Sequence, residues 1–225
     1  MNIELAKENM IKQQIRTLGV PYGDLLSVII DTPREVFVPS NYKEVAYSEV
    51  EILLNHHQYE LTPQTVTKML QLLQPKKHER VLELGCGSGY LTALLAKLTK
   101  LVDVVDPHED MLNHVKNALK TIGVYNAKYH VNKENNVDGL NQLLQEHNVF
   151  DLVIVKEMQK SEPTDYLKYL AANGRMLYFL EKDSYAKAVL VQKNADGSYQ
   201  QMSTFDVYKS VGQIRQKLQD ETFQF

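Results

Sequence analysis

The sequence predicts an α/β protein with a doubly wound, mostly parallel sheet of seven strands. Short apolar runs that alternate with helical stretches after Pro63 indicate right-handed crossovers and helices on both faces of the sheet. An Asp-Gly turn between two alternating runs near the end of the chain indicates a terminal antiparallel hairpin. The first 62 residues lack this alternation, and we expect them to form a small N-terminal helical lobe.

The expected N-terminal lobe spans residues 1–62. Apolar residues at near-helical spacing predict a helix over about the first 15 residues, and Gly19 and Pro21 end that pattern. A second short helix is expected over residues 22–30. The stretches that follow are broken by prolines and carry short apolar runs, which is typical of loops and small strands.

The sheet domain is expected over residues 63–210. It begins with an amphipathic helix over 63–73, with Pro63 at its first position and Thr62 as the N-cap. The expected parallel strands are 80–85, 101–106, 127–131, 150–155 and 175–180, and the closing hairpin is 187–208. The helices expected between them are 89–98, 108–123, 137–147 and 163–171. The polar residues 211–225 are expected to form a peripheral segment.

Composition narrows the class of protein further. Of the 225 residues, 44% are apolar and 24% are charged, which are ordinary values for a folded domain, and the net charge of −3 favours neither a nucleic-acid nor a membrane partner. The first residues lack the apolar run of a signal peptide, so a cytoplasmic protein is expected. The single cysteine, Cys86, cannot form an intramolecular disulfide or a cysteine-based zinc cluster, and no metal site is expected.

The strongest motif is VLELGCGSGY, in which an expected strand runs directly into Gly85, Gly87 and Gly89 and then into a helix. Glycines allow a tight turn there and let a ligand approach the backbone, while the helix N-terminus offers free N–H groups. Asp106 ends the next strand 17 residues after Gly89, where its carboxylate can accept both hydroxyls of an adenosine ribose. The spacing is GxGxG, whereas a pyrophosphate is usually held by GxGxxG, so a nicotinamide cofactor is disfavoured.

The stretch ELGCGSG resembles the first motif of class I S-adenosylmethionine-dependent methyltransferases, whose sheet carries the same terminal antiparallel hairpin. The resemblance implies S-adenosyl-L-methionine as cofactor. It implies that Glu83 and the loop 85–89, including Cys86, face the methionine part, and that Asp106 and Pro107 lie at the ribose. Two other interpretations stay open: a strand-to-helix turn without ligand, and Asp106 as a helix cap. Cys86 is expected to fill space in the loop.

The prefix to this motif is more specific. TPREVFVP and AYSE, in that order before the glycine loop, resemble the protein-L-isoaspartate O-methyltransferase family, and the similarity covers about residues 13–180. The resemblance implies methyl transfer to the free carboxylate of L-isoaspartyl residues in damaged proteins, and isoaspartyl peptides or proteins as partners. That carboxylate, with a pKa near 4 in solution, is already ionised at neutral pH, so catalysis depends mainly on orientation.

The acceptor-site motif departs from the family pattern. The family reads close to GQTISQP, and alignment on Pro63 without a gap places Leu61 at the serine that is taken to orient the substrate carboxylate. Tyr59 falls on the preceding threonine, and Thr62 is one residue from the expected hydroxyl. Tyr59 and Thr62 are therefore the candidate catalytic residues, although a helix N-cap explains Thr62 better.

Other positions depart from the family pattern as well. The family's GDG falls on residues 132–134, so that Lys133 stands where an acceptor for the adenine amino group is expected. Asp138 could replace it, but we expect Asp138 to be a helix N-cap. Asn173 and Gly174 replace a Gly-Gly pair. His56 and His57 are expected to be loop residues, because adjacent side chains of a strand point to opposite faces and no further ligand cluster is near.

Three functional hypotheses remain from the sequence. The first is methylation of isoaspartyl residues, the second is a family member that binds the cofactor or a protein partner without this activity, and the third is methylation of another acceptor. Leu61 and Lys133 motivate the second hypothesis, and the unusual polar residues near Tyr59 motivate the third.

Overall fold

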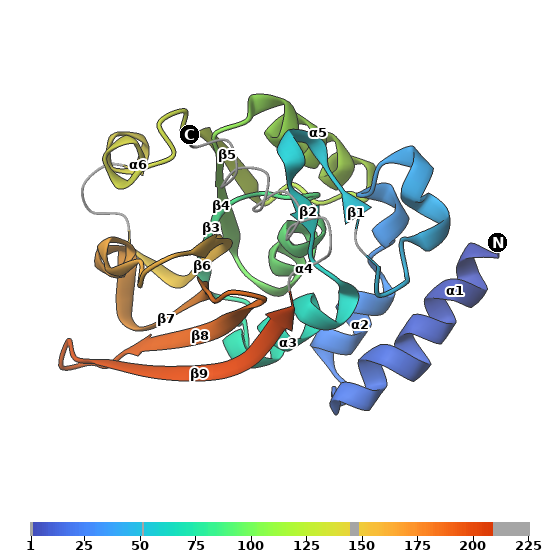
Figure 1. Cartoon of the computed structure of the whole chain (residues 1–225), viewed down its shortest axis with the longest axis horizontal. Coiled ribbons are helices and arrows are strands. Elements are labelled where there is room, and N and C mark those ends of the chain that lie inside the picture. The colour runs from blue at the N-terminus through green and yellow to red at the C-terminus, as the bar shows by residue number, and fades with distance from the viewer. Residues whose placement is uncertain (1, 51, 145–148, 209–225) are drawn as a thin grey trace.

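The computed structural model describes residues 2–50, 52–144 and 149–208, and a seven-stranded sheet forms its centre (Figure 1). The strand order is β5-β4-β3-β6-β7-β8-β9, in which β3 to β7 are parallel and the two last pairings are antiparallel. The strands are β3 (Arg80–Leu84), β4 (Leu101–Asp106), β5 (Ala127–Val131), β6 (Phe150–Gln159), β7 (Leu170–Glu181), β8 (Tyr185–Lys193) and β9 (Tyr199–Tyr208). The predicted fold class is confirmed, including the terminal hairpin.

Helices cover both faces of this sheet, because the central strands are apolar on both faces. On β6, Leu152 and Ile154 face one buried cluster, while Val153 and Val155 face the other. The first cluster includes residues of α3 (Pro63–Leu73), α4 (Tyr90–Leu98) and α5 (Glu109–Thr121), and the second includes residues of α6 (Val137–Leu144). Across the described part of the chain, no helix is long and apolar enough to cross a membrane.

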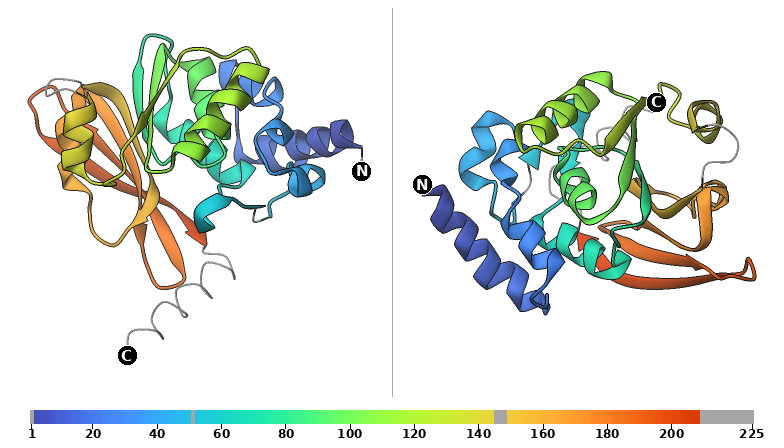
Figure 2. Two further views of the ribbon diagram at one scale, coloured as in Figure 1. Left: turned by 90° about the horizontal axis from the view of Figure 1, so that it is seen from above. Right: turned by 180° about the vertical axis from the view of Figure 1, so that it is seen from behind.

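The N-terminal residues pack on the first of these faces. They form α1 (Ile3–Asn9), α2 (Asp24–Ile30), several short helical turns and a small hairpin of β1 (Ile52–Leu53) and β2 (Tyr59–Glu60). Met10, Ile15 and Leu26 are buried in the same cluster as α3 and α4, so this lobe shares the core of the sheet domain. Figure 2 shows its helices on one side of the molecule and strands β7 to β9 on the other.

Several local expectations need correction. The α-helix expected over 163–171 is wrong: a six-residue 3-10 turn spans Thr164–Tyr169, and β7 already begins at Leu170. Leu170 pairs with Phe150 and is buried, so sheet pairing and burial prevail over the helical pattern. The helix expected over about the first 15 residues, by contrast, is present as α1 followed by a π-helical turn over Met10–Ile15. The segment expected at 211–225, and the end of the helix expected over 137–147, lie outside the described residues.

An ion pair fastens α3 to the sheet at the amino ends of the parallel strands. Arg175 of β7 donates from Nη2 to both carboxylate oxygens of Glu79 at 3.0 Å, and from Nε to the Leu73 carbonyl at 2.7 Å. Glu79 is buried, and it also accepts a bond from the Lys76 backbone N–H. The guanidinium therefore binds the last turn of α3 and the loop that leads into β3.

We predict that Arg175→Met lowers the free energy of unfolding by about 3 kcal/mol, because it leaves the Glu79 carboxylate buried without its cation. Urea unfolding measures the change. The control is Lys128→Met on the edge strand β5, whose side chain is exposed and whose loss should change stability little. Equal stabilities of the two variants would contradict this role for Arg175.

Candidate active site

The glycine loop turns the chain from β3 into α4 at the carboxyl ends of the parallel strands. Gly85, Gly87 and Gly89 all have positive φ, of 88°, 55° and 90° respectively, a region that other residues rarely adopt. A Cβ atom on Gly89 would lie 2.8 Å from both methyl groups of Val115, so the loop also needs glycine for close packing on α5. The Gly85 N–H donates to the Val105 carbonyl at 2.8 Å and ties the loop to β4.

Asp106 fastens this loop from the end of β4. Its carboxylate is buried and accepts from the Cys86 N–H at 2.9 Å through Oδ2, and from the His108 N–H at 2.9 Å through Oδ1. These bonds close the turn around Pro107, and they do not cap α5, whose N-cap residue is His108. Burial, followed by the charge of Asp106, raises the pKa of the Cys86 thiol, which fits its expected place as a buried loop residue.

Glu83 lies under the loop with two partners. Its carboxylate is fully buried, accepts from the Thr92 hydroxyl at 2.7 Å and pairs with the Lys156 ammonium at 3.3 Å. Burial alone would lower the pKa of Lys156, but the charges of Glu83 and Glu60 outweigh it and raise that pKa, so the lysine stays charged. Lys156 also donates to the Cys86 carbonyl at 2.8 Å.

A buried arginine, Arg34, binds the segment of residues 59–62 that precedes α3. Arg34 donates from Nη2 to the Leu61 carbonyl at 2.7 Å, lies 3.5 Å from Glu60 through Nη1, and stacks on the Tyr90 ring at 4.8 Å. Glu60 is buried as well, and its Oε2 accepts from the Ser88 N–H of the glycine loop at 3.1 Å. The acceptor-side segment and the glycine loop are therefore joined by a hydrogen bond.

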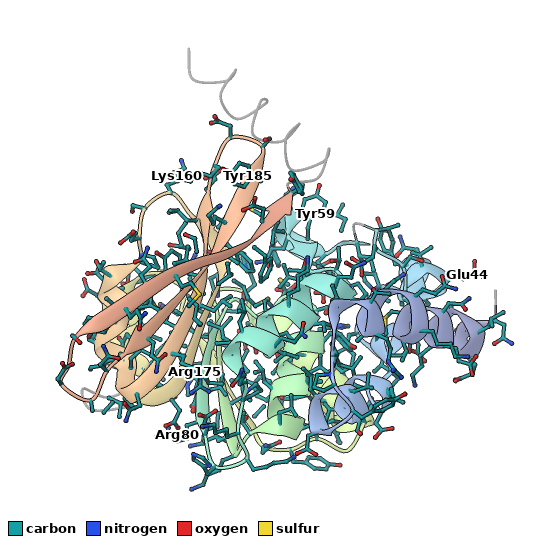
Figure 3. All side chains as sticks on the ribbon, turned by 90° about the horizontal axis from the view of Figure 1, so that it is seen from below. Glu44, Tyr59, Arg80, Lys160, Arg175 and Tyr185 are labelled. Atoms are coloured by element: carbon teal, nitrogen blue, oxygen red, sulfur yellow. The ribbon has the colours of Figure 1, made fainter. Side chains whose placement is uncertain are left out.

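The expected catalytic residues lie in this segment. Thr62 is the N-cap of α3, as predicted: its hydroxyl accepts from the Thr65 N–H at 3.3 Å and donates to the Thr65 hydroxyl at 3.0 Å. Leu61 packs against the main core cluster, and Tyr59 is half-buried. Figure 3 shows Tyr59, Lys160 and Tyr185 at one end of the molecule and Arg80 and Arg175 at the other, which places Tyr59 at the carboxyl end of the sheet.

His56 makes two contacts that the sequence did not predict. Residues 55–57 make a 3-10 turn, in which His56 and His57 both have φ of 55°. The His56 ring stacks on His108 with centroids 3.7 Å apart, and its Nε2 lies 2.9 Å from an oxygen of Asp110. Within the described residues, no group of three or more His, Cys, Asp or Glu side chains is placed to hold a metal ion.

The expectation that Asp138 is the N-cap of α6 is wrong. Asn136 accepts from the Gly139 N–H at 2.8 Å and so caps α6, whereas Asp138 is exposed in the first turn of that helix. Lys133 is exposed. A small cavity of about 30 Å³ lies beside the turn after β5. Its lining residues include Leu84, Gly85, Val105, Asn132, Glu157 and Tyr166.

The sequence did not single out Lys156 and Arg34, and it indicated Glu60 only as a polar residue of an unusual acceptor pocket, although each carried a signal. Lys156 directly follows the apolar run FDLVIV, so a charge at the carboxyl end of a central strand could have been noticed. Glu60 stands in the acceptor motif, and Arg34 stands in TPREVFVP. Arg34 and Glu60 bond to residues 27 and 28 positions away, and Lys156 bonds to residues 73 and 70 positions away, which single-sequence patterns do not reveal.

A glycine loop after the first parallel strand, an acid at the end of the next strand and an antiparallel last pair of strands define a class I S-adenosylmethionine-dependent methyltransferase. The family model of protein-L-isoaspartate(D-aspartate) O-methyltransferase matches residues 5–211, and the chain belongs to this family.

Relatives support this assignment, and a solved structure shares the fold. Protein-L-isoaspartate O-methyltransferase of Petrotoga mobilis is 28% identical over 198 residues, which cover 88% of this chain and 91% of that protein. The enzyme of the same name from Aliivibrio salmonicida is 32% identical over 76% of this chain and 80% of its own. A Plasmodium falciparum structure assigned to the same activity, in complex with S-adenosyl-L-homocysteine, has a TM-score of 0.71 and 21% identity, and the match covers 94% of this chain and 98% of that chain.

The family's cofactor fits the backbone of this site. The glycines leave the loop open to close approach, and Asp106 stands next to it at the end of β4. The loop's own polar groups, however, are bonded to Lys156 and Glu60. Two polar groups of the loop, the Ser88 N–H and the Cys86 carbonyl, are therefore already hydrogen-bonded to side chains of the protein itself.

We predict that Thr62→Ala lowers the free energy of unfolding by about 1 kcal/mol, because it removes the N-cap of α3. Thr62→Asn is the matched variant, since asparagine caps helices well without a hydroxyl, and it should keep near wild-type stability. Thermal unfolding measures both. If methylation survives in Thr62→Asn at the wild-type rate, the hydroxyl has no part in the reaction, whereas a specific loss would assign it one.

Proposed function

We propose that this chain transfers a methyl group from S-adenosyl-L-methionine to the free side-chain carboxylate of L-isoaspartyl residues in proteins, as a repair reaction. The observation that carries the proposal is the family match over residues 5–211, together with a glycine loop of the geometry that the class requires. Damaged proteins and peptides are the partners, and the cytoplasm is the compartment we infer from the sequence.

Methyl transfer to this acceptor does not require a strong general acid or base. The acceptor carboxylate has a pKa near 4 in solution, so it is an anion at neutral pH and a nucleophile without proton removal. When bound, the cofactor supplies an electrophilic methyl group. What the protein must add is a fixed approach of the carboxylate and exclusion of water.

We assign cofactor contacts to the residues that surround the glycine loop. These are Glu83, Gly85, Cys86, Gly87, Gly89, Asp106 and Pro107. Gly85 and Gly87 give access to the backbone, and each oxygen of the Asp106 carboxylate, which accepts one backbone N–H bond, can also accept a ribose hydroxyl. Because the Asp106 carboxylate is buried, the loop has to move before a ribose can reach it.

We assign the acceptor side to the lobe of residues 1–62. Arg34 fixes the Leu61 carbonyl and thereby the direction of the segment that leads into α3. Tyr59 and Thr62 carry the hydroxyl groups of this segment, and of the two the Thr62 hydroxyl is bonded to Thr65. Tyr59 is therefore the better donor to an incoming carboxylate in this arrangement.

The direct test is incubation of the purified protein with methyl-labelled S-adenosylmethionine and an L-isoaspartyl peptide. We expect label in the peptide as a methyl ester that base releases as methanol. The control is the same peptide with an ordinary aspartyl residue, which should stay unlabelled. A level of ester no higher than the blank for the isoaspartyl peptide would overturn the proposal.

We predict that Leu61→Ser raises the rate of isoaspartyl methylation by about tenfold, because one added hydrogen bond to the carboxylate improves its orientation by roughly 1.4 kcal/mol. Initial rates at saturating cofactor measure the gain. Leu53→Ser is the control, since Leu53 lies in the hairpin that leads to Leu61 but is 40% exposed. A rate unchanged or reduced in Leu61→Ser, with stability retained, would show that the acceptor is held by other groups.

A further inference from the structure

Lys156 occupies one side of the glycine loop. It follows Val155, the last residue of β6 that pairs with β3, and its ammonium binds the Cys86 carbonyl at 2.8 Å and the Glu83 carboxylate at 3.3 Å. Only 11% of its side chain is exposed. The ammonium lies 2.8 Å from the point where a Cβ atom would stand on Gly87, so it fills the space that this glycine leaves open.

Glu60 occupies the other side of the same loop. Its Oε2 accepts from the Ser88 N–H at 3.1 Å, next to the N-terminus of α4, and lies 3.4 Å from the same point on Gly87. Its Oε1 lies 3.5 Å from Nη1 of Arg34, whose side chain is 1% exposed. A carboxylate at a helix N-terminus is a favourable arrangement, and here the protein supplies it from its own chain.

The two side chains together present the charges of an α-amino acid. An ammonium on a carbonyl and a carboxylate, and a carboxylate on an N–H at the start of a helix, are the contacts that a zwitterion makes with such a loop. The cofactor of the class ends in an amino acid with these two groups. We propose that Lys156 and Glu60 set the cofactor affinity of this chain by occupying the amino-acid end of the site, so that binding requires their displacement.

Displacement of Glu60 would also reach the acceptor side. Glu60 pairs with Ile52 in the small hairpin and directly precedes Leu61 and Thr62. At the other end of that hairpin, His56 stacks on His108, which bonds to Asp106. Both ends of the hairpin thus contact residues of the proposed cofactor site. A cofactor that displaces Glu60 therefore also shifts the adjoining residues Leu61 and Thr62, which lie on the acceptor side. This inference rests on the proposed function, because it assumes that cofactor.

Calorimetry with S-adenosylhomocysteine tests the proposal without any turnover. Lys156→Met removes the ammonium and keeps the length of the side chain, and we expect it to bind S-adenosylhomocysteine about tenfold more tightly than the wild type. Methylthioadenosine lacks the amino acid and should bind both proteins equally. Lys160→Met, at an exposed position four residues further along, should change neither affinity.

Each outcome decides the question. Equal affinity of the wild type and folded Lys156→Met for S-adenosylhomocysteine, or a gain that methylthioadenosine shares, would overturn the proposal. Weaker binding by the variant would overturn it too, because Lys156 would then hold the cofactor's carboxylate. Ester formation by the wild type is measured separately, so failure of the proposed function remains distinguishable from failure of this inference.

A second measurement on the wild type covers the case in which Lys156→Met does not fold. Hydrogen exchange is followed with and without S-adenosylhomocysteine. We expect faster exchange of backbone amides in residues 52–60 when the ligand is bound, alongside slower exchange in the loop 85–89. Unchanged exchange of the hairpin under conditions that protect the loop would overturn the proposed displacement of Glu60.

Discussion

The structure depends on the close approach of β3, α4, β4 and α5 at the glycine loop. Gly89 lies so near Val115 that no side chain fits between them, Gly85 bonds to β4, and Cys86 is held by Asp106. The positive φ angles at the three glycines permit this turn, and the parallel pairing of β3 with β4 and β6 brings the partners to one edge of the sheet. At this edge the side chains of Lys156 and Glu60 lie against the backbone of the loop.

Buried charges then connect the loop to the rest of the molecule. Arg34, Glu60, Lys156 and Glu83 alternate in sign along a path from the N-terminal lobe to the floor of the loop. Burial makes each of these charges costly alone, so each constrains its neighbour more strongly than a surface pair would. The lobe and the sheet domain therefore share a buried polar network in addition to a common apolar core, although their sequence patterns differ.

Much of the fold could be predicted because its signals are local. Thr62 and Pro63 mark the start of α3, and apolar runs mark the strands, since both depend on neighbouring residues alone. The helix expected over 163–171 failed because pairing of Leu170 with a distant strand decided that segment. The cap of α6 is Asn136 rather than Asp138, an error of register that a turn after β5 easily produces. The contacts of Lys156 and Glu60 depend on the folded chain and could not be seen in advance.

Two departures from the family pattern, Leu61 and Lys133, lie outside the strands of the large sheet. Leu61 stands in the connection from the hairpin to α3, and Lys133 lies in the turn after β5, whereas Glu83, Gly85 and Asp106 lie on or next to central strands. A carboxylate acceptor needs orientation and not proton removal, so a lost hydroxyl weakens alignment without removing a reactive group. The charged groups of Lys156 and Glu60 at the loop act on cofactor binding, which precedes the alignment of the acceptor. The two effects reside in adjacent residues, because Glu60 ends the hairpin and Leu61 follows it directly, and binding and alignment are therefore linked through the backbone they share.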